Sequence, residues 1–462
     1  MKGAVLFGPG DVRYVERKDP EILEPTDAII RMSATCVCGS DLWPYRGIDS
    51  PNGPTPMGHE YCGIVEEVGR AVTEIKPGQF VVGSFFASDN TCAICRAGYQ
   101  SRCVHAFPMG REGAQAPFLR VPLADGTLVA TPELPSERLV PGLLSASDVL
   151  GTGWFGAEAA AVAPGKTVAI VGDGAVGLCA VIAAKQMGSE RIIMMSRHED
   201  RQRLAREFGA SEIVTERGDE GITRIKDMTD GLGAHSVIEA VGTQESMMQA
   251  IHSTRPGGHV GFVGVAHGVA IPGVELFFAE VHLHGGPAPV RKYLPQLIDL
   301  VLNRTIDPGK VFDLTLAARP GGGGLPGDER APCDQSTARP GTLGTEAVKI
   351  RMEVGGTPLA ATLDDTETAR DFASLLPLTL TLDDYAATEK ISDLPRRLTT
   401  AGAPVGAAAS AGDISYYAPW GNLALFYRDS EFAGGLVRLG RIDGDAGALR
   451  RRGPLTAKIE RI

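Results

Sequence analysis

The sequence predicts three structural parts: a β-rich domain, an α/β domain with a doubly wound parallel sheet, and a second β domain. Short apolar runs in the first 150 residues, such as 28–32 and 80–83, are broken by Gly and Pro, as in antiparallel strands of a barrel. A strand, a G-x-G-x-x-G turn and an apolar helix follow in that order at 167–185, and strand and helix patterns alternate to residue 284. Residues 348–354 alternate strictly between apolar and charged side chains, which again predicts a strand.

The composition is that of an ordinary globular protein and argues against two classes of partner. The 462 residues are 43% hydrophobic and 22% charged, with a net charge of −11. No run of Lys and Arg stands out, so we expect no nucleic-acid partner. The most apolar helix-length stretch contains Asp173 and several Gly, so we expect no membrane span. The start of the chain lacks the long apolar segment of a signal peptide, so we expect a cytoplasmic protein.

A thiol, an imidazole and carboxylates in the first domain suggest a metal site. Cys38 opens the turn Cys38-Gly39-Ser40-Asp41, and His59 is followed directly by Glu60. Thiolate sulfur and imidazole nitrogen are good zinc ligands, and a neighbouring carboxylate can orient them. Each residue alone is more often a buried core residue or a helix cap. Their combination favours a catalytic metal, with Asp41 orienting His59.

A second metal site is indicated by a loop rich in cysteine. Cys92, Cys95 and Cys103 lie close together in the sequence. In a large chain without an export signal, clustered cysteines suggest a metal before disulfides. Close Cys pairs in a loop hold a tetrahedral structural zinc. The alternative is a metal-free loop with three free thiols.

The glycine-rich turn of the second domain predicts a dinucleotide site. Its glycines let the backbone approach a pyrophosphate at the start of the following helix, because a side chain would stand in the way. The alternative, a turn without a ligand, is less favoured in this strand-to-helix context. The candidate binding residues in the turn are Gly172, Gly174, Ala175, Val176 and Gly177.

The end of the next strand favours NADP over NAD. An NAD site normally has Asp or Glu there, on the ribose 2′-hydroxyl. This sequence has Ser196 and Arg197 instead, and Arg201 follows one helical turn later. Such residues can bind a 2′-phosphate, which an acid would repel. The alternative is that both arginines lie on a solvated helix face.

Together these motifs resemble the zinc-dependent alcohol dehydrogenases of the medium-chain dehydrogenase/reductase superfamily, over residues 1 to about 316. The resemblance implies a GroES-like β-barrel catalytic domain at 1–150 and a Rossmann NAD(P)-binding domain at 151–284. It also implies that 285–316 return to the first domain, although that return is incomplete.

The resemblance assigns roles to further residues. A third catalytic zinc ligand is expected just before the cofactor domain, where Asp148 stands. Ser40 resembles the hydroxyl that relays the substrate proton, and Glu60 the carboxylate behind the zinc. The family's structural site usually has four cysteines; Cys92, Cys95 and Cys103 match the last three, and Asp89 stands at the first. Carboxylate oxygen also binds zinc, so we expect two zinc ions per chain. The residues expected near nicotinamide are Thr152, Val241 and Val263.

The resemblance stops after residue 316. Residues 317–346 are rich in Gly and Pro and show no apolar periodicity, so we expect a disordered linker or an out-of-frame copy of the missing return. Residues 347–462 resemble bacterial cyclophilin-like domains through G-D-I-x-Y-Y, L-F-Y and L-G-R-I. The residue pattern of true prolyl isomerases is absent, so we expect no isomerase activity. Aromatic side chains here either line a peptide groove or, as is more usual, form the barrel core: Tyr416, Tyr417, Trp420, Phe426 and Tyr427.

The predicted function is a zinc-dependent oxidoreductase that transfers a hydride between NADP(H) and a small alcohol or aldehyde. The family commonly forms dimers or tetramers, so we expect a homo-oligomer. A zinc-free quinone reductase of the same superfamily is disfavoured by Cys38, His59 and Asp148. The other alternative is an inactive or truncated dehydrogenase, whose C-terminal barrel acts as a binding module.

Overall fold

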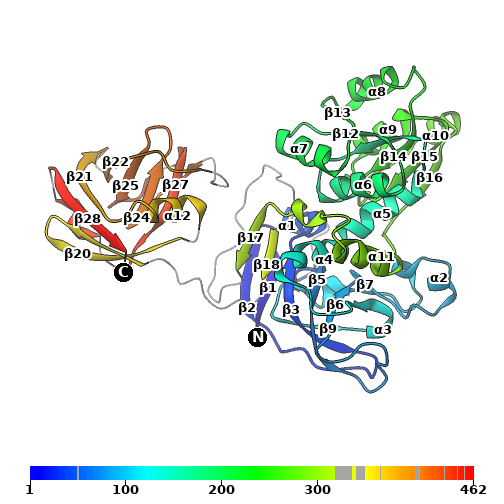
Figure 1. Cartoon of the computed structure of the whole chain (residues 1–462), viewed down its shortest axis with the longest axis horizontal. Helices are drawn as coiled ribbons and strands as arrows, with labels where there is room; N and C mark the ends of the chain where they lie inside the picture. The colour runs from blue at the N-terminus through cyan, green and yellow to red at the C-terminus, as the bar shows by residue number, and fades with distance from the viewer. Residues whose placement is uncertain are drawn as a thin grey trace. The chain divides into compact units, whose positions relative to one another are not determined.

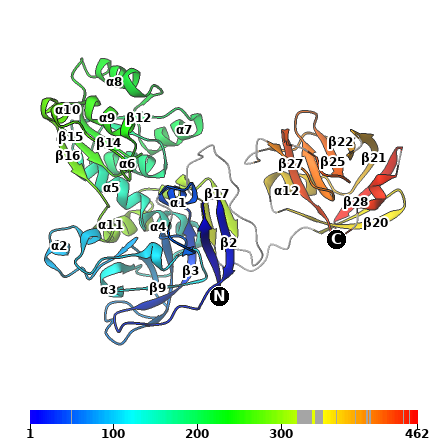
Figure 2. The same cartoon turned by 180° about the vertical axis from the view of Figure 1, so that it is seen from behind.

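The computed structural model describes residues 1–48, 51–317, 336–339 and 349–461, apart from 365, 387, 401, 402, 404, 405, 431, 445 and 452. The chain divides into two compact units, residues 1–342 and 343–462. Each unit is drawn in Figures 1 and 2. Within the described residues, no helix has the length and hydropathy that a bilayer span requires.

The N-terminal part of the first unit is built on a large sheet that begins with the predicted apolar runs. Its strands follow the order β10-β6-β5-β3-β18-β17, where β17 is Leu314–Ala317 and β18 is Ser336–Arg339, and β9 also pairs with β3. A smaller sheet has the order β2-β1-β4. One core cluster of this part includes Ile30, Tyr61 and Val81. The strands are β1 (Lys2–Gly8), β2 (Asp11–Glu16), β3 (Ala28–Cys36), β4 (Thr55–Pro56), β5 (Tyr61–Val68), β6 (Phe80–Gly83), β7 (Phe86–Ala87), β8 (Phe107–Pro108), β9 (Phe118–Val121) and β10 (Leu128–Ala130).

Helices complete this part and lead into the cofactor domain. Asp148 lies directly before α5, which packs against α6 (Ala175–Gln186) of the next domain. The helices are α1 (Leu42–Tyr45), α2 (Ala93–Arg96), α3 (Ala124–Thr127), α4 (Val140–Ala146), α5 (Val149–Ala159) and the returning α11 (Val290–Leu302).

The second domain of this unit contains the predicted doubly wound parallel sheet, which is confirmed. Its order is β13-β12-β11-β14-β15-β16, and all neighbouring strands are parallel. The strands are β11 (Thr167–Val171), β12 (Arg191–Met195), β13 (Glu212–Val214), β14 (Ala234–Glu239), β15 (Thr254–Phe262) and β16 (His282–Gly285). The helices are α6 (Ala175–Gln186), α7 (Glu199–Phe208), α8 (Gly218–Asp227), α9 (Gln244–Ser253) and α10 (Gly273–Ala279).

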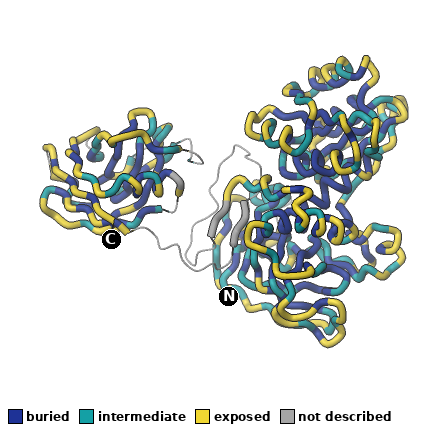
Figure 3. Tube along the Cα trace, viewed as in Figure 1, coloured by how far each residue is buried: buried dark blue, intermediate teal, exposed yellow. Residues whose placement is uncertain are grey.

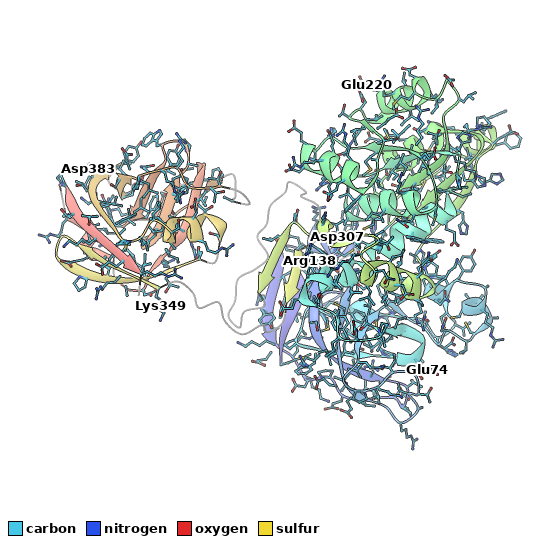
Figure 4. The ribbon with its side chains drawn as sticks, in the orientation of Figure 1. Glu74, Arg138, Glu220, Asp307, Lys349 and Asp383 are labelled. Atoms are coloured by element: carbon cyan, nitrogen blue, oxygen red, sulfur yellow. The ribbon has the colours of Figure 1, made fainter. Side chains whose placement is uncertain are left out.

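Both faces of this sheet are covered, which explains why β11 is a nearly continuous apolar run. Val168 and Ile170 pack with α5, α6 and α7, whereas Ala169 and Val171 pack with α8 and α9. Figure 3 shows this buried layer between exposed helix surfaces. Glu220 on α8 is exposed and points outward in Figure 4.

The return to the first domain contains one strand that the sequence did not predict. β17 (Leu314–Ala317) pairs with β18 (Ser336–Arg339), and β18 pairs with β3. The sequence predicts a linker or an out-of-frame segment over residues that include 336–339, and no strand there. That assignment missed the strand because backbone ladder hydrogen bonds do not require an alternating apolar pattern. The rest of the predicted linker or out-of-frame segment, 318–335 and 340–346, lies outside the described residues.

The second unit contains a closed barrel of eight strands with its own core, as predicted. The barrel order is β19-β20-β27-β24-β25-β22-β21-β28. Tyr416, Phe426 and Tyr427 are buried, whereas Trp420 is 54% exposed, in edge-to-face contact with Tyr417. Most of these aromatic residues therefore belong to the interior. The elements are β19 (Lys349–Val354), β20 (Thr357–Leu363), α12 (Glu367–Ala373), β21 (Leu378–Tyr385), β22 (Glu389–Asp393), β23 (Gly406–Ala407), β24 (Asp413–Tyr417), β25 (Asn422–Phe426), β26 (Ala433–Gly434), β27 (Leu436–Ile442) and β28 (Leu455–Arg461).

Candidate catalytic and metal sites

The turn after β3 places Cys38 and Ser40 at the first site. The backbone N–H of Cys38 donates to Oδ2 of Asp41 at 3.0 Å, so the side chain of Asp41 closes the turn around Cys38. Cys38 is buried. Its sulfur is held in the interior by this turn, at the end of a strand of the large sheet.

His59 is oriented by the same aspartate. Its Nδ1 lies 3.2 Å from Oδ1 of Asp41, which leaves Nε2 to face the other residues of the site. Nε2 lies 3.2 Å from Oδ2 of Asp148 and 3.4 Å from the hydroxyl of Ser40. A carboxylate on one imidazole nitrogen is the usual way in which a metal-binding histidine is fixed.

Asp148 brings the third donor from the start of α5. Oδ1 accepts a hydrogen bond from the hydroxyl of Thr152 at 2.6 Å, one helical turn along. Oδ2 therefore points toward Cys38, whose sulfur is 3.8 Å away, and toward His59. Thr152, which is predicted to lie near nicotinamide, thus orients the side chain of Asp148. One donor atom from each of Cys38, His59, Glu60 and Asp148 lies within 4.8 Å of the others.

The electrostatics of this cluster suit a cation. Burial, together with the carboxylates of Asp148 and Glu60, raises the pKa of the Cys38 thiol to about 12. Burial likewise raises the pKa of Glu60 to about 8, with a contribution from Asp148. For His59, burial opposes protonation, but Asp41 and Asp148 outweigh it and hold the pKa well above its usual value. Buried acidic groups that repel one another are stabilised by a divalent ion, so this sulfur, nitrogen and oxygen donor set fits zinc.

A second donor set lies in residues 89–105, which we call the cysteine lobe. One donor atom from each of Asp89, Cys92, Cys95 and Cys103 lies within 4.8 Å of the others. The sulfurs of Cys92 and Cys103 are 3.9 Å apart. The four predicted ligands therefore lie close together, and Asp89 supplies the fourth donor atom.

Backbone N–H groups point at the sulfurs of the cysteine lobe. Those of Asp89 and His105 donate to Cys103, and that of Cys95 donates to Cys92. Hydrogen bonds from the backbone of Val104 and Cys95 lower the pKa of the Cys92 thiol to about 7. Because thiolate is the form that binds metal, these donors fit a structural zinc.

The predicted glycine-rich turn connects β11 to α6. A Cβ on Gly177 would lie 1.8 Å from the carbonyl oxygen of Gly172, so the turn cannot close with any other residue there. A Cβ on Gly174, in contrast, would meet no atom within 4 Å. Gly174 is the N-cap of α6 and faces open space at the helix start. The turn thus fits a pyrophosphate.

The residues after β12 form a network that the sequence analysis missed. Asp173, in the glycine-rich turn, accepts from the hydroxyl of Ser196 at 2.7 Å and pairs with the Arg201 guanidinium at 3.1 Å. Arg197 is exposed, and no ion pair holds it within the described part of the chain. Arg197 and Arg201 are the two arginines predicted to bind a 2′-phosphate. Arg201 forms an ion pair with Asp173, whereas Arg197 forms none among the described residues. An Asp between two glycines of the turn is the sequence feature from which this network could have been predicted.

Val241 and Val263 follow the neighbouring strands β14 and β15. A Cβ on Gly172 would lie 2.6 Å from Cγ2 of Val241, so the turn and this valine are in direct contact. Val263 faces Gly156 of α5. Both valines therefore lie at the carboxyl edge of the sheet, where ligands of doubly wound folds bind.

Comparison with known proteins agrees with this geometry. Residues 24–133 match the alcohol dehydrogenase GroES-like domain, and residues 175–303 match the zinc-binding dehydrogenase family. The zinc-type alcohol dehydrogenase B of Aspergillus flavus is 34% identical over 312 residues, which cover 65% of this chain and 72% of that protein. The chain belongs to the zinc-type alcohol dehydrogenase family. Residues 352–460 match the cyclophilin-like family, so this dehydrogenase carries an additional domain.

Two further similarities span most of the dehydrogenase part. The structure of zinc dependent alcohol dehydrogenase 2 from Streptococcus pneumonia has a TM-score of 0.62 and 31% identity, covering 69% of this chain and 91% of that one. The NADP-dependent isopropanol dehydrogenase of Thermoanaerobacter brockii is 32% identical over 323 residues, 67% of this chain and 91% of that protein.

Replacing Gly174 with Ala tests the dinucleotide turn. The new methyl group meets nothing in the chain, so we expect an unchanged thermal midpoint. It would occupy the space for the pyrophosphate, so NADPH binding should weaken at least about tenfold, or ~1.4 kcal/mol. Isothermal titration of NADPH measures this effect. Gly273→Ala, which also meets no atom within 4 Å, is the matched control, and equal NADPH affinity in both variants would contradict the assignment.

Proposed function

We propose that the chain is a zinc-dependent oxidoreductase that interconverts a small alcohol and its aldehyde, with NADP(H) as cofactor. The observation that carries the proposal is the convergence of Cys38, His59 and Asp148 from three separate elements onto one buried point. Membership of the zinc-type alcohol dehydrogenase family supports the same class of reaction.

The residues of the first site divide into ligands and supporting groups. Cys38, His59 and Asp148 would hold the zinc, and Glu60 lies beside them as a further buried carboxyl. When bound, zinc supplies a Lewis acid that lowers the pKa of the alcohol, and nicotinamide supplies the hydride acceptor. The hydroxyl of Ser40, 3.4 Å from His59, is placed to receive the substrate proton and pass it outward. Asp41 and Thr152 keep His59 and Asp148 in position.

The preference for NADP rests on the end of β12. That strand is followed by Ser196 and Arg197, and an acid that would repel the 2′-phosphate is absent from these two positions. The exposed Arg197 offers a free guanidinium, whereas Arg201 is paired with Asp173. A relative whose name states NADP dependence matches over this region, which supports the preference.

A homo-oligomer is also part of the proposal. Among the described strands β16 pairs only with β15, so one edge of the cofactor sheet is open. On the nearby α10, Phe277 and Phe278 are 74% and 76% exposed. Open strand edges and exposed large apolar side chains are features that a second copy of the chain would cover.

Zinc-dependent turnover is the direct test of this function. We expect the purified chain to reduce small aldehydes with NADPH, to lose activity after chelation, and to regain it when zinc is restored. Asp148→Asn should lower kcat/KM by roughly a hundredfold or more, because it removes an anionic ligand that is buried at the site. Absence of turnover with every short-chain alcohol and aldehyde, in a chain that contains zinc, would favour the alternative of an inactive dehydrogenase with a binding module.

The cofactor preference is tested separately with Arg197→Ala. Loss of one charge-assisted contact of about 1.5–3 kcal/mol should reduce kcat/KM for NADPH by about ten- to a hundredfold. The value for NADH should stay close to that of the parent chain, since NADH has no 2′-phosphate. Arg203→Ala, on the helix that follows Arg197 and paired with Asp200, is the matched control. An equal fall for both cofactors would contradict a role in phosphate recognition.

A further inference from the structure

One residue outside the predicted ligand set contacts two of the four ligands in the cysteine lobe. The backbone N–H of His105 donates to the sulfur of Cys103 at 3.3 Å. Its side-chain Nδ1 lies 2.8 Å from Oδ2 of Asp89. His105 therefore links the first ligand of the lobe to the last, across 14 residues of chain.

The carboxylate of Asp89 accepts hydrogen bonds from two backbone groups in addition to its contact with His105. Oδ1 of Asp89 accepts from the backbone N–H groups of Thr91 and Cys92, at 2.7 and 2.9 Å. A carboxylate has about four lone-pair sites. The two backbone groups and His105 occupy three of them, which leaves one site for a metal. Asp89 is thus prepared to bind through a single oxygen, as cysteine binds through a single sulfur.

We propose that His105 is a positioning residue for the cysteine lobe: it fixes the carboxylate of Asp89 so that Asp89 replaces a fourth cysteine ligand. The inference rests on the proposed zinc in this lobe. It goes beyond that site because it assigns a function to a residue that is not a ligand. A carboxylate oxygen binds zinc at a shorter distance than the large, polarisable sulfur of cysteine does. A neighbouring donor that orients the carboxylate compensates for this difference.

The geometry argues against His105 as a ligand. The donor atoms of Asp89, Cys92, Cys95 and Cys103 already form a mutually close set of four, the number that a structural zinc takes. The side chain of His105 is 68% exposed, whereas that of Asp89 is 17% exposed. The imidazole is thus far more exposed to solvent than the carboxylate that it contacts.

The test measures zinc affinity of the lobe in the full-length chain carrying Cys38→Ala, which disables the first site. Competition with a chelator of known affinity gives the zinc dissociation constant. His105→Ala should weaken binding about 10- to 100-fold, the usual effect of removing a group that orients a ligand. His105→Asn should stay close to the parent, because the amide nitrogen of Asn can replace Nδ1 as donor. His252→Ala removes a histidine–carboxylate pair outside the lobe, with Glu275, and is the matched control.

A double-mutant comparison separates positioning from ligation. If His105 acts through Asp89, His105→Ala should add little once Asp89→Asn is present, because the two effects share one contact. Unchanged affinity in His105→Ala, or a full additional loss in the Asp89→Asn background, would overturn the inference.

A Cys38→Ala chain that binds no zinc would instead refute the zinc site in the cysteine lobe itself. If Cys38→Ala does not fold, the same variants in the otherwise unaltered chain, followed by zinc content after dialysis against the chelator, give the same comparison.

Discussion

The structure of the dehydrogenase part depends on one electrostatic constraint: acidic groups are buried together where three elements meet. Cys38 follows β3, His59 precedes β5, and Asp148 precedes α5, so the site forms only when the large sheet and this helix are docked. Without a cation, the carboxylates raise the pKa of the buried thiol further than burial alone would. Burying unpaired charge is costly, and a divalent ion offsets that cost while using the same donors.

Helix α5 connects this constraint to the cofactor domain. It carries Asp148 and Thr152 at its start, and it packs against α6, the helix that begins at the glycine-rich turn. A Cβ on Gly153 would lie 2.6 Å from the backbone nitrogen of Ala180, so the two helices approach at backbone distance. A single helix therefore sets the position of the third metal donor relative to the pyrophosphate turn. In the proposed enzyme, this helix contact would fix the metal site relative to the cofactor site.

Local patterns were sufficient to predict the domains' fold and the candidate ligands, but not the contacts that orient them. The glycine-rich turn and the alternation within β19 have local causes, and the sequence predicts both elements. The pairing of Asp173 with Arg201, and of His105 with Asp89, joins residues 28 and 16 positions apart through tertiary geometry. Sequence spacing does not show which side chains face one another across such distances. The same reason explains why the strand Ser336–Arg339, which lacks an apolar pattern and is recognised only by its pairing with β3, was missed.

The zinc content per chain of the purified, unchelated protein, measured by mass spectrometry of the metal, tests whether both donor sets hold zinc. We expect close to two zinc ions in the parent chain, one for each donor set. We expect about one each in Asp148→Ala and Cys92→Ala, because each variant removes a ligand from a different site. A parent chain without zinc, or an Asp148→Ala chain that retains both ions and full activity, would contradict the proposed role of Cys38, His59 and Asp148.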